Sequence, residues 1–253
     1  MTAQGGELVP LMNMFDGPSQ QIIANTRVEQ TNGDDISAFE DGGWAFTRVG
    51  SISEITLKSA AEDAGLTWEE LERIPLGSGS ETQAVLESDR ADILSTSPNN
   101  AAKAVSSGEA YLVTNPQDDE SSPIAKQLNS VLAASPDFVT QYPEFTQDVV
   151  TAVVGELSEL AAATSPDEVL EGMPAEFVAA NADNWDLLWE YSHTGFTRAT
   201  GGFSQEEIDQ TVAGAQLVAV VDSSYAPPAE LFDNSRIVAA YEEIGADAPA
   251  GLS

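Results

Sequence analysis

The chain has no cysteine and a single histidine, His193, among its 253 residues. The lack of cysteine excludes disulfides, thiolate zinc sites and cysteine nucleophiles, and one histidine excludes a multi-histidine metal cage. No apolar run approaches the roughly 20 residues that a membrane helix needs. The first ten residues, MTAQGGELVP, have neither the basic region nor the apolar core of a signal peptide, so the numbered chain is expected to contain none.

Basic residues are also scarce. Nine lysines and arginines stand against 42 aspartates and glutamates, which gives a formal net charge of −33. Such a charge repels phosphate backbones and anionic membrane surfaces, so nucleic acid is excluded as a partner. Hydrophobic residues make up 42% of the chain, as in folded proteins, so the acidic residues are expected on a surface. An acidic surface of this kind suggests a salt-rich setting in which ions screen the self-repulsion.

The clearest local pattern runs from Trp44 to Leu66, WAFTRVGSISEITLKSAAEDAGL. The apolar run from Trp44 to Val49 predicts a strand, Gly50 and Ser51 predict a turn, and the following residues predict a helix. The first N–H groups of a helix have no partner within it. A corner between a strand and a helix is therefore suited to hold a small polar molecule.

Strands and helices continue to alternate after this corner. The sequence predicts strands at 73–76, 91–96 and 111–114, with helices starting near Ser80 and Ser97 between them. This alternation predicts an α/β fold with a mostly parallel sheet. Polar or glycine-rich breaks at 41–43 and 115–123 divide the chain into one lobe of residues 1–42 and 126–253 and a second lobe of residues 43–125. Two such lobes leave a cleft at their hinge.

Residues from 135 onward are predicted to be mainly helical. Apolar residues recur at helical spacing from Phe145 to Leu160, and a final helix is expected from Asn234 to Ile244, ending at Gly245. Capping boxes are predicted at Ser51, Thr67, Ser80 and Ser204, because each is followed three residues later by Glu or Gln.

Three stretches resemble one protein family: FTRVGSISEITLKSAAEDAGL, LESDRADILSTSP and SVLAASPDFVTQYPEFTQDVVTAVVGEL. Their order and spacing are similar to those of the solute-binding proteins of ABC importers, in the branch for nitrate, sulfonate, taurine and thiamine precursors. The last helix, FDNSRIVAAYEEIG, is also similar. The resemblance implies a type II periplasmic-binding-protein fold of two lobes. One departure is that a βαβ portion which usually begins the first lobe is missing before Leu8, so the chain looks short at its N-terminus.

The same resemblance implies what the protein does. It implies a monomeric extracytoplasmic protein that captures a small organic solute, such as a sulfonate, nitrate, a pyrimidine or an amine, and delivers it to a membrane permease. No chemistry, cofactor or metal is expected. Two alternatives remain open: an enzyme of the same fold that forms a pyrimidine precursor, and a ligand-sensing module coupled to a partner protein.

The candidate solute-binding residues lie at predicted turns. The resemblance implicates the corner after the central strand, and the carboxyl ends of other predicted strands add further polar residues, since open α/β sheets bind ligands there. The candidates are Gly50, Ser51, Ile52 and Ser53 at the corner, Ser78 in the GSGS turn, Ser97 and Asn99 after the ADILST strand, and Asn13 after LVPLM.

Each of these candidates also has a purely structural interpretation. The capping box at Ser51 can satisfy the corner's donors internally, and Glu54 in the first turn would compete with an anionic solute. Trp185 and Trp189 are interpreted first as core residues and second as a stacking wall for an aromatic solute. His193 is interpreted as a packing residue, and the acidic run at 118–120 as a solvated loop rather than a metal site.

Overall fold

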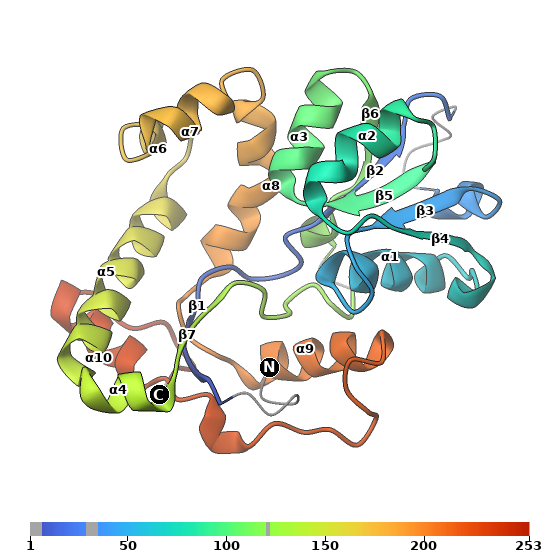
Figure 1. Cartoon of the computed structure of the whole chain (residues 1–253). Coiled ribbons are helices and arrows are strands. Elements are labelled where there is room, and N and C mark those ends of the chain that lie inside the picture. The colour runs from blue at the N-terminus through green and yellow to red at the C-terminus, as the bar shows by residue number, and fades with distance from the viewer. Residues whose placement is uncertain (1–6, 29–34, 120–121, 253) are drawn as a thin grey trace.

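A five-stranded sheet forms the core of one part of the molecule (Figure 1). The computed structural model describes residues 7–28, 35–119 and 122–252. The strand order is β4 (Glu72–Pro75), β3 (Gly43–Phe46), β5 (Ile93–Thr96), β2 (Gln21–Asn25) and β6 (Ala110–Thr114). β3 is parallel to β4 and β5, and β2 is antiparallel to β5 and β6. Four of the five strands therefore run in one direction, as the alternation of strands and helices predicts.

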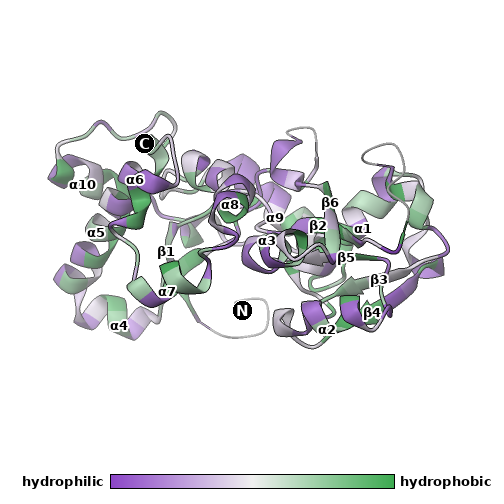
Figure 2. Ribbon diagram, turned by 90° about the horizontal axis from the view of Figure 1, so that it is seen from above, coloured by the Kyte–Doolittle hydropathy of each residue, from purple (hydrophilic) through white to green (hydrophobic). Residues whose placement is uncertain are grey.

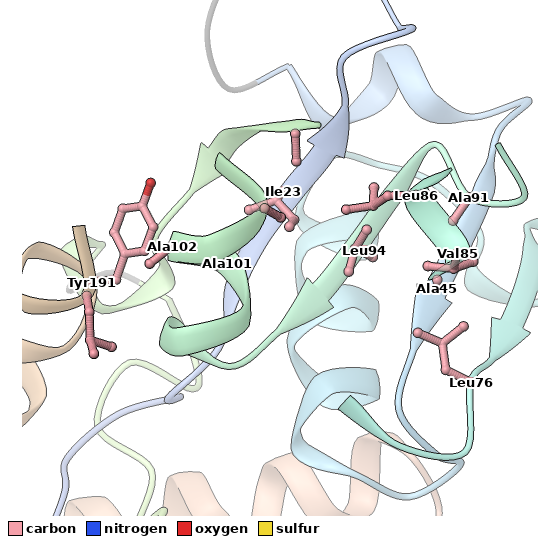
Figure 3. Packing of buried hydrophobic residues seen from close by; sticks show 13 residues of the cluster. Ile23, Ala45, Leu76, Val85, Leu86, Ala91, Leu94, Ala101, Ala102 and Tyr191 are labelled. Carbon is pink, nitrogen blue, oxygen red and sulfur yellow. The ribbon is translucent and has the colours of Figure 1, made fainter. Parts of the chain in front are cut away.

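Helices cover both faces of this sheet because successive strand residues point to opposite faces. Ile22 and Ala24 of β2 pack with Trp44 and Phe46 toward α1 (Ile52–Asp63), whereas Ile23 faces the other way. Figure 3 shows Ile23 among the residues of that second core, which also contains side chains of α2 (Thr82–Glu87) and α3 (Pro98–Ser106). Short 3-10 turns at Ile36–Phe39 and Trp68–Glu70 close the α1 face.

The second part of the molecule is mainly helical. Its only strands among the described residues are β1 (Val9–Asn13) and β7 (Val131–Ala134), which pair antiparallel. α4 (Pro136–Gln141), α5 (Pro143–Ala162) and α10 (Ser235–Ile244) pack around this pair, and their core includes Met12, Val150, Val154 and Ile237, all fully buried. α5 is the long amphipathic helix that the sequence predicts. Gly245 ends α10 in the left-handed conformation (φ 74°), as expected.

Three helices form an arch that returns from α5 to the five-stranded sheet (Figure 1): α6 (Asp167–Leu170), α7 (Ala175–Ala180) and α8 (Trp185–Arg198). α8 packs on both α5 and α3, so it joins the two parts of the molecule. Figure 2, seen from above, shows α8 between the α5 side and the β-sheet side. α9 (Gln205–Leu217) then runs under the sheet and packs against α1. Short 3-10 turns lie at Gly79–Glu81, Pro116–Asp118 and Ala229–Leu231.

The structure places β2 differently from the division of the chain expected above. Residues 21–25 were expected in the first lobe, but β2 is hydrogen-bonded between β5 and β6 of the five-stranded sheet. The chain therefore first crosses between the two parts at residues 14–20 rather than at 41–43. It returns to the helical part between β6 and β7, where the backbone N–H of Gly17 donates to the carbonyl of Gln127 at 3.0 Å. The two crossing segments thus lie side by side.

The predicted helix starts have mixed outcomes. Ser51 caps α1, and Ser204 forms a complete capping box with Glu207 at the start of α9. Thr67 makes no side-chain cap hydrogen bond, and α2 begins at Thr82 instead of after Ser80. Among the described residues, none of the helices is both long enough and apolar enough to span a bilayer.

Replacing Gly195 tests how closely α8 approaches the first crossing. A Cβ added to Gly195 would overlap the ring of Phe15, whereas a Cβ added to Gly155 in α5 would meet no atom within 4 Å. Gly195→Ala should lower the free energy of unfolding by about 1 to 3 kcal/mol through overpacking. Gly155→Ala should raise it by about 0.5 to 1 kcal/mol, because alanine favours helices. Urea unfolding of both variants measures the two effects, and equal stabilities would contradict the packing described here.

Candidate functional site

A cavity of about 320 Å³ lies between α8 and the loop that follows β5. Its wall is mostly apolar and aromatic, with hydroxyl and amide groups from several segments. The lining residues are Phe15, Ser19, Ser97, Pro98, Asn99, Ser130, Leu160, Val169, Met173, Phe177, Trp185, Leu188, Trp189, Ser192 and Phe196. Both parts of the molecule therefore contribute to one cavity.

One face of α8 supplies the aromatic side of this cavity. Trp185, Trp189, Ser192 and Phe196 follow each other at intervals of four, three and four residues, which places them on the same face of a helix. Neighbouring rings support these walls. Phe177 packs edge-on against Trp185 with ring centroids 6.1 Å apart, and Phe15 packs edge-on against Phe196 at 4.9 Å.

The opposite side is formed by Ser97, Pro98 and Asn99, at the end of β5 and the start of α3. Pro98 occupies the first turn of α3 as predicted, and the Ser97 hydroxyl makes no cap hydrogen bond. The Asn99 side-chain Oδ1 is buried and has no hydrogen-bond partner among the described residues. A solute with a donor group could satisfy this oxygen, and uncapped N–H groups at the start of α3 are available to an acceptor.

A larger groove of about 890 Å³ continues from this cavity along α5. The groove and the cavity share six lining residues: Phe15, Ser130, Leu160, Val169, Met173 and Phe196. The two spaces are therefore parts of one cleft. The groove alone is also lined by four exposed glutamates: Glu156, Glu159, Glu168 and Glu171.

The predicted corner after β3 satisfies its own polar groups. The Ser51 hydroxyl donates to the carbonyl of Arg48 at 2.6 Å, and the backbone N–H of Thr47 donates to the Ser53 Oγ at 2.9 Å. The backbone N–H of Gly50 donates to the Glu54 carboxylate at 2.6 Å. Ser53 is fully buried, whereas Gly50, Ser51 and Ile52 are partly exposed. This network fits the capping interpretation of the corner, and its binding role stays a prediction.

Two further predicted residues lie outside the cavity lining. Ser78 is exposed, and its Oγ lies 2.7 Å from the Oγ of Ser80 in the same turn. Asn13 is fully buried, and its side-chain Nδ2 donates to the Asp16 carboxyl group. Of the eight candidates from the sequence, the cavity contains Ser97 and Asn99.

The segment after β1 carries a buried carboxyl group, Asp16, which is 7% exposed. Burial, and after it the neighbouring Glu207 carboxylate, raise the pKa of Asp16 to about 8, while Asn13 and Arg198 oppose the shift. Glu207 also receives the backbone N–H of Ser204 at 2.5 Å. A protonated Asp16 can donate to Glu207, so these two acids share a proton near the crossing.

The remaining candidates behave as structural residues. His193 stacks on Trp189 with ring centroids 4.0 Å apart. Asp118 and Asp119 are exposed, and Glu120 lies outside the described residues. Within the described ranges, acidic residues and histidine do not gather into a group of three that could hold a metal ion.

Sequence reasoning missed most of the cavity wall. Phe15, Phe177, Phe196, Ser19, Ser130 and Ser192 were not candidates, and Trp185 and Trp189 were assigned first to the core. The sequence of α8 did indicate one wall of the cavity, because two tryptophans, a serine and a phenylalanine recur at helical spacing and so share one face. The residues on other segments come together only through the fold.

Comparison with solved structures gives many matches to the whole chain. A protein from Bordetella bronchiseptica matches with a TM-score of 0.75 at 16% identity, covering 96% of this chain and 77% of that chain. The putative sulfonate-binding protein SsuA of Methylobacillus flagellatus matches with a TM-score of 0.66 at 16% identity, covering 96% and 72%. The periplasmic nitrate-binding protein NrtA of Synechocystis matches with a TM-score of 0.69 at 11% identity, covering 97% and 71%.

The chain has the periplasmic binding protein fold. Within that fold it resembles SsuA and NrtA, as its three sequence stretches predict. The similar structures are mainly binding proteins, but they include a mutant of the enzyme DszB, solved in complex with biphenyl-2-sulfinic acid (TM-score 0.63). No protein-family model and no curated protein sequence matches the chain.

The Asp16 carboxyl should make stability depend on pH. Its pKa in the folded state is above the unfolded value of 3.8, so its stabilising contribution is complete below pH 4 and is lost as pH rises toward about 8. Asp16→Asn keeps an acceptor for Asn13 and a donor for Glu207 without a titrating group. The variant should therefore match the parent near pH 4 and exceed its free energy of unfolding near pH 8, by on the order of 1 to 3 kcal/mol.

Urea unfolding from pH 4 to pH 9 measures this difference. Asp148→Asn, which removes an exposed carboxylate from α5, is the matched control and should show no comparable change with pH. If the difference in free energy of unfolding between Asp16→Asn and the parent stayed constant from pH 4 to pH 9, a proton shared by Asp16 and Glu207 would be contradicted.

Proposed function

We propose that this protein is an extracytoplasmic solute-binding protein of an ABC importer, and that it captures a small organic solute in the cavity beside α8. The observation that supports this most strongly is that one cavity receives Ser97 and Asn99 from the sheet part and Leu160 and Phe196 from the helical part. The fold it shares with SsuA and NrtA supports the same role.

The size and lining of the cavity suit a small molecule. A volume of about 320 Å³ is near the lower end of the range for such sites, roughly 300 to 1,000 Å³. Mostly apolar walls with a few polar groups are typical of ligand sites, in which the polar groups set orientation. Here α8 supplies much of the apolar surface, other segments add the rest, and the polar groups come from Ser19, Ser97, Asn99, Ser130 and Ser192.

Two lobes are proposed on the basis of the chain crossings. The first lobe comprises residues 9–14 and 131–252, and the second comprises residues 21–28 and 35–114, with the crossing segments between them as the hinge. The crossings run antiparallel, with Asp16 bridged to Leu128. A solute that touches both lobes favours the closed state only by as much as it binds that state better.

The partners and location follow from this role. A monomer that carries its solute to a membrane permease fits the import systems to which SsuA belongs. Two alternatives from the sequence remain: a ligand-sensing module coupled to a partner protein, and an enzyme of the same fold that forms a pyrimidine precursor. The similar structures include one enzyme, DszB, among mainly binding proteins. Solute binding without turnover would distinguish the binding roles from the enzyme.

A thermal-shift screen tests the proposed function. Sulfonates, nitrate, pyrimidines and amines should be compared, because a solute that binds only the folded protein raises its melting temperature. At about 100 times its Kd a true solute should raise the melting temperature by about 5 to 10 °C. Failure of every class to shift it would contradict the proposal.

Two variants locate the site for any solute found. Trp189→Ala removes an aromatic wall of the cavity and should weaken binding by about tenfold or more. Ser51→Ala changes the internally bonded corner and should leave the affinity within about twofold, since its hydroxyl is used within the protein. Weaker binding in Ser51→Ala together with unchanged binding in Trp189→Ala would place the solute at the corner. For each variant, the melting temperature with solute is compared with the melting temperature of the same variant without solute.

A further inference from the structure

The charges along the cleft are all of one sign. The smaller cavity has no charged residue among its lining side chains. The adjoining groove is lined by Glu156, Glu159, Glu168 and Glu171 and by no lysine, arginine or histidine. A solute that enters through the groove therefore meets a negative potential before it reaches the aromatic walls.

At least one of these glutamates is held in its ionised form. The backbone N–H of Thr164 donates to the Glu168 carboxylate at 2.8 Å, and the Thr164 hydroxyl donates to it at 3.0 Å. These bonds lower the pKa of Glu168. Glu156 and Glu159 extend from the exposed side of α5, and Glu171 lies in the turn after α6.

No basic side chain neutralises the groove. All nine lysines and arginines belong to the described residues, and none of them lines either space. Arg27, Lys58 and Lys126 form ion pairs with acidic residues that line neither space. No positive side chain therefore stands among the glutamates of the lining, and their charge has the same sign as the net charge of the whole chain.

The deeper walls offer a second feature that favours cations. Trp185, Trp189, Phe177, Phe15 and Phe196 all line the cavity, and the faces of aromatic rings carry partial negative charge. Tryptophan is the strongest partner for an organic cation, and an ammonium group within about 6 Å of a ring centroid is attracted. The same rings also bury an apolar body.

We propose that the cleft selects an organic cation, a small molecule with an ammonium group on an apolar or aromatic body, over an anion of the same size. This inference deepens the proposed function and rests on it. The glutamates of the groove raise the local concentration of cations, and the aromatic cavity binds the body and the charged group together. An organic sulfonate would meet repulsion from the glutamates and no positive side chain in the lining.

One feature of the cavity favours an anion, namely the start of α3 at Ser97 to Asn99. The N-terminal end of a helix acts as roughly half a positive charge, whereas the groove carries up to four full negative charges. We therefore expect the start of α3 to bind a neutral acceptor on the solute, such as a hydroxyl or carbonyl oxygen. The Asn99 Oδ1, which has no hydrogen-bond partner among the described residues, could accept from a donor group on the same solute.

The test compares three probes that share one ring: benzyltrimethylammonium chloride, benzyl alcohol and sodium benzenesulfonate. Isothermal titration of the full chain should give benzyltrimethylammonium an affinity at least about tenfold above that of benzenesulfonate, with benzyl alcohol between them. Raising NaCl from about 50 to about 500 mM should weaken binding of the cation more than binding of the alcohol.

Charge-neutralising variants identify the source of the preference. The double variant Glu156→Gln with Glu159→Gln should weaken binding of benzyltrimethylammonium by about threefold to tenfold and leave benzyl alcohol within about twofold. The matched control, Glu87→Gln with Glu242→Gln, removes two exposed carboxylates that line neither the groove nor the cavity. It should leave both affinities within about twofold if the groove itself attracts the cation.

The outcomes separate this inference from the function on which it rests. Tighter binding of benzenesulfonate than of benzyltrimethylammonium would overturn the cation preference and still support a solute-binding cleft. Equal losses of affinity for benzyltrimethylammonium in the Glu156/Glu159 variant and in the Glu87/Glu242 control would also overturn it, because the effect would then come from the net charge of the protein. If none of the probes binds and the thermal-shift screen also finds no solute, both the preference and the proposed function fail.

Discussion

The packing of α8 between the two parts of the molecule is the interaction on which the rest of the structure depends. Leu188 and Tyr191 insert into the core of the five-stranded sheet, where Ala101 and Ala102 of α3 leave room for the tyrosine ring (Figure 3). Polar bonds reinforce this contact. The Gln21 side chain donates to the carbonyl of Tyr191 at 2.8 Å, and all of these groups are buried. The register of α8 against the sheet is therefore strongly constrained.

The same helix is tied to both crossing segments. The backbone N–H of Asp16 donates to the carbonyl of Gly195 at 3.0 Å, and the N–H of Gly195 donates to the side chain of Gln117 at 3.0 Å. These bonds lie at a glycine whose missing side chain lets Phe15 approach. With one face of α8 fixed in this way, the adjacent face, with Trp185 and Trp189, forms the wall of the cavity.

Local structure could be predicted from the sequence wherever one short segment determines it. α1, α3, α5, α9 and α10 follow from apolar periodicity and from capping residues such as Ser51 and Ser204. The partner of β2 could not be predicted in this way. The local sequence QIIAN predicts a strand without naming its partners, and its place is decided by hydrogen bonds to strands about 70 to 90 residues further on.

The candidate site was only partly predictable for a related reason. Ser97 and Asn99 follow a strand, which is a local signal, and they do line the cavity. The Gly50 to Ser53 corner has the same local signal, but its donors are satisfied by Arg48 and Glu54, its Ser53 Oγ accepts from Thr47, and only coordinates show this. The aromatic wall combines rings from separate segments, so no single stretch of sequence contains it. The four glutamates gather in the same way, from the second half of α5, from α6 and from the turn after α6.

A crystal structure of the protein with a bound solute tests the central claim most directly, namely that α8 and the start of α3 enclose the binding site. The account predicts density for the solute between Trp185 or Trp189 and the segment from Ser97 to Asn99, in contact with residues of both parts. Density at the Gly50 to Ser53 corner, with the space beside α8 filled only by water, would contradict it.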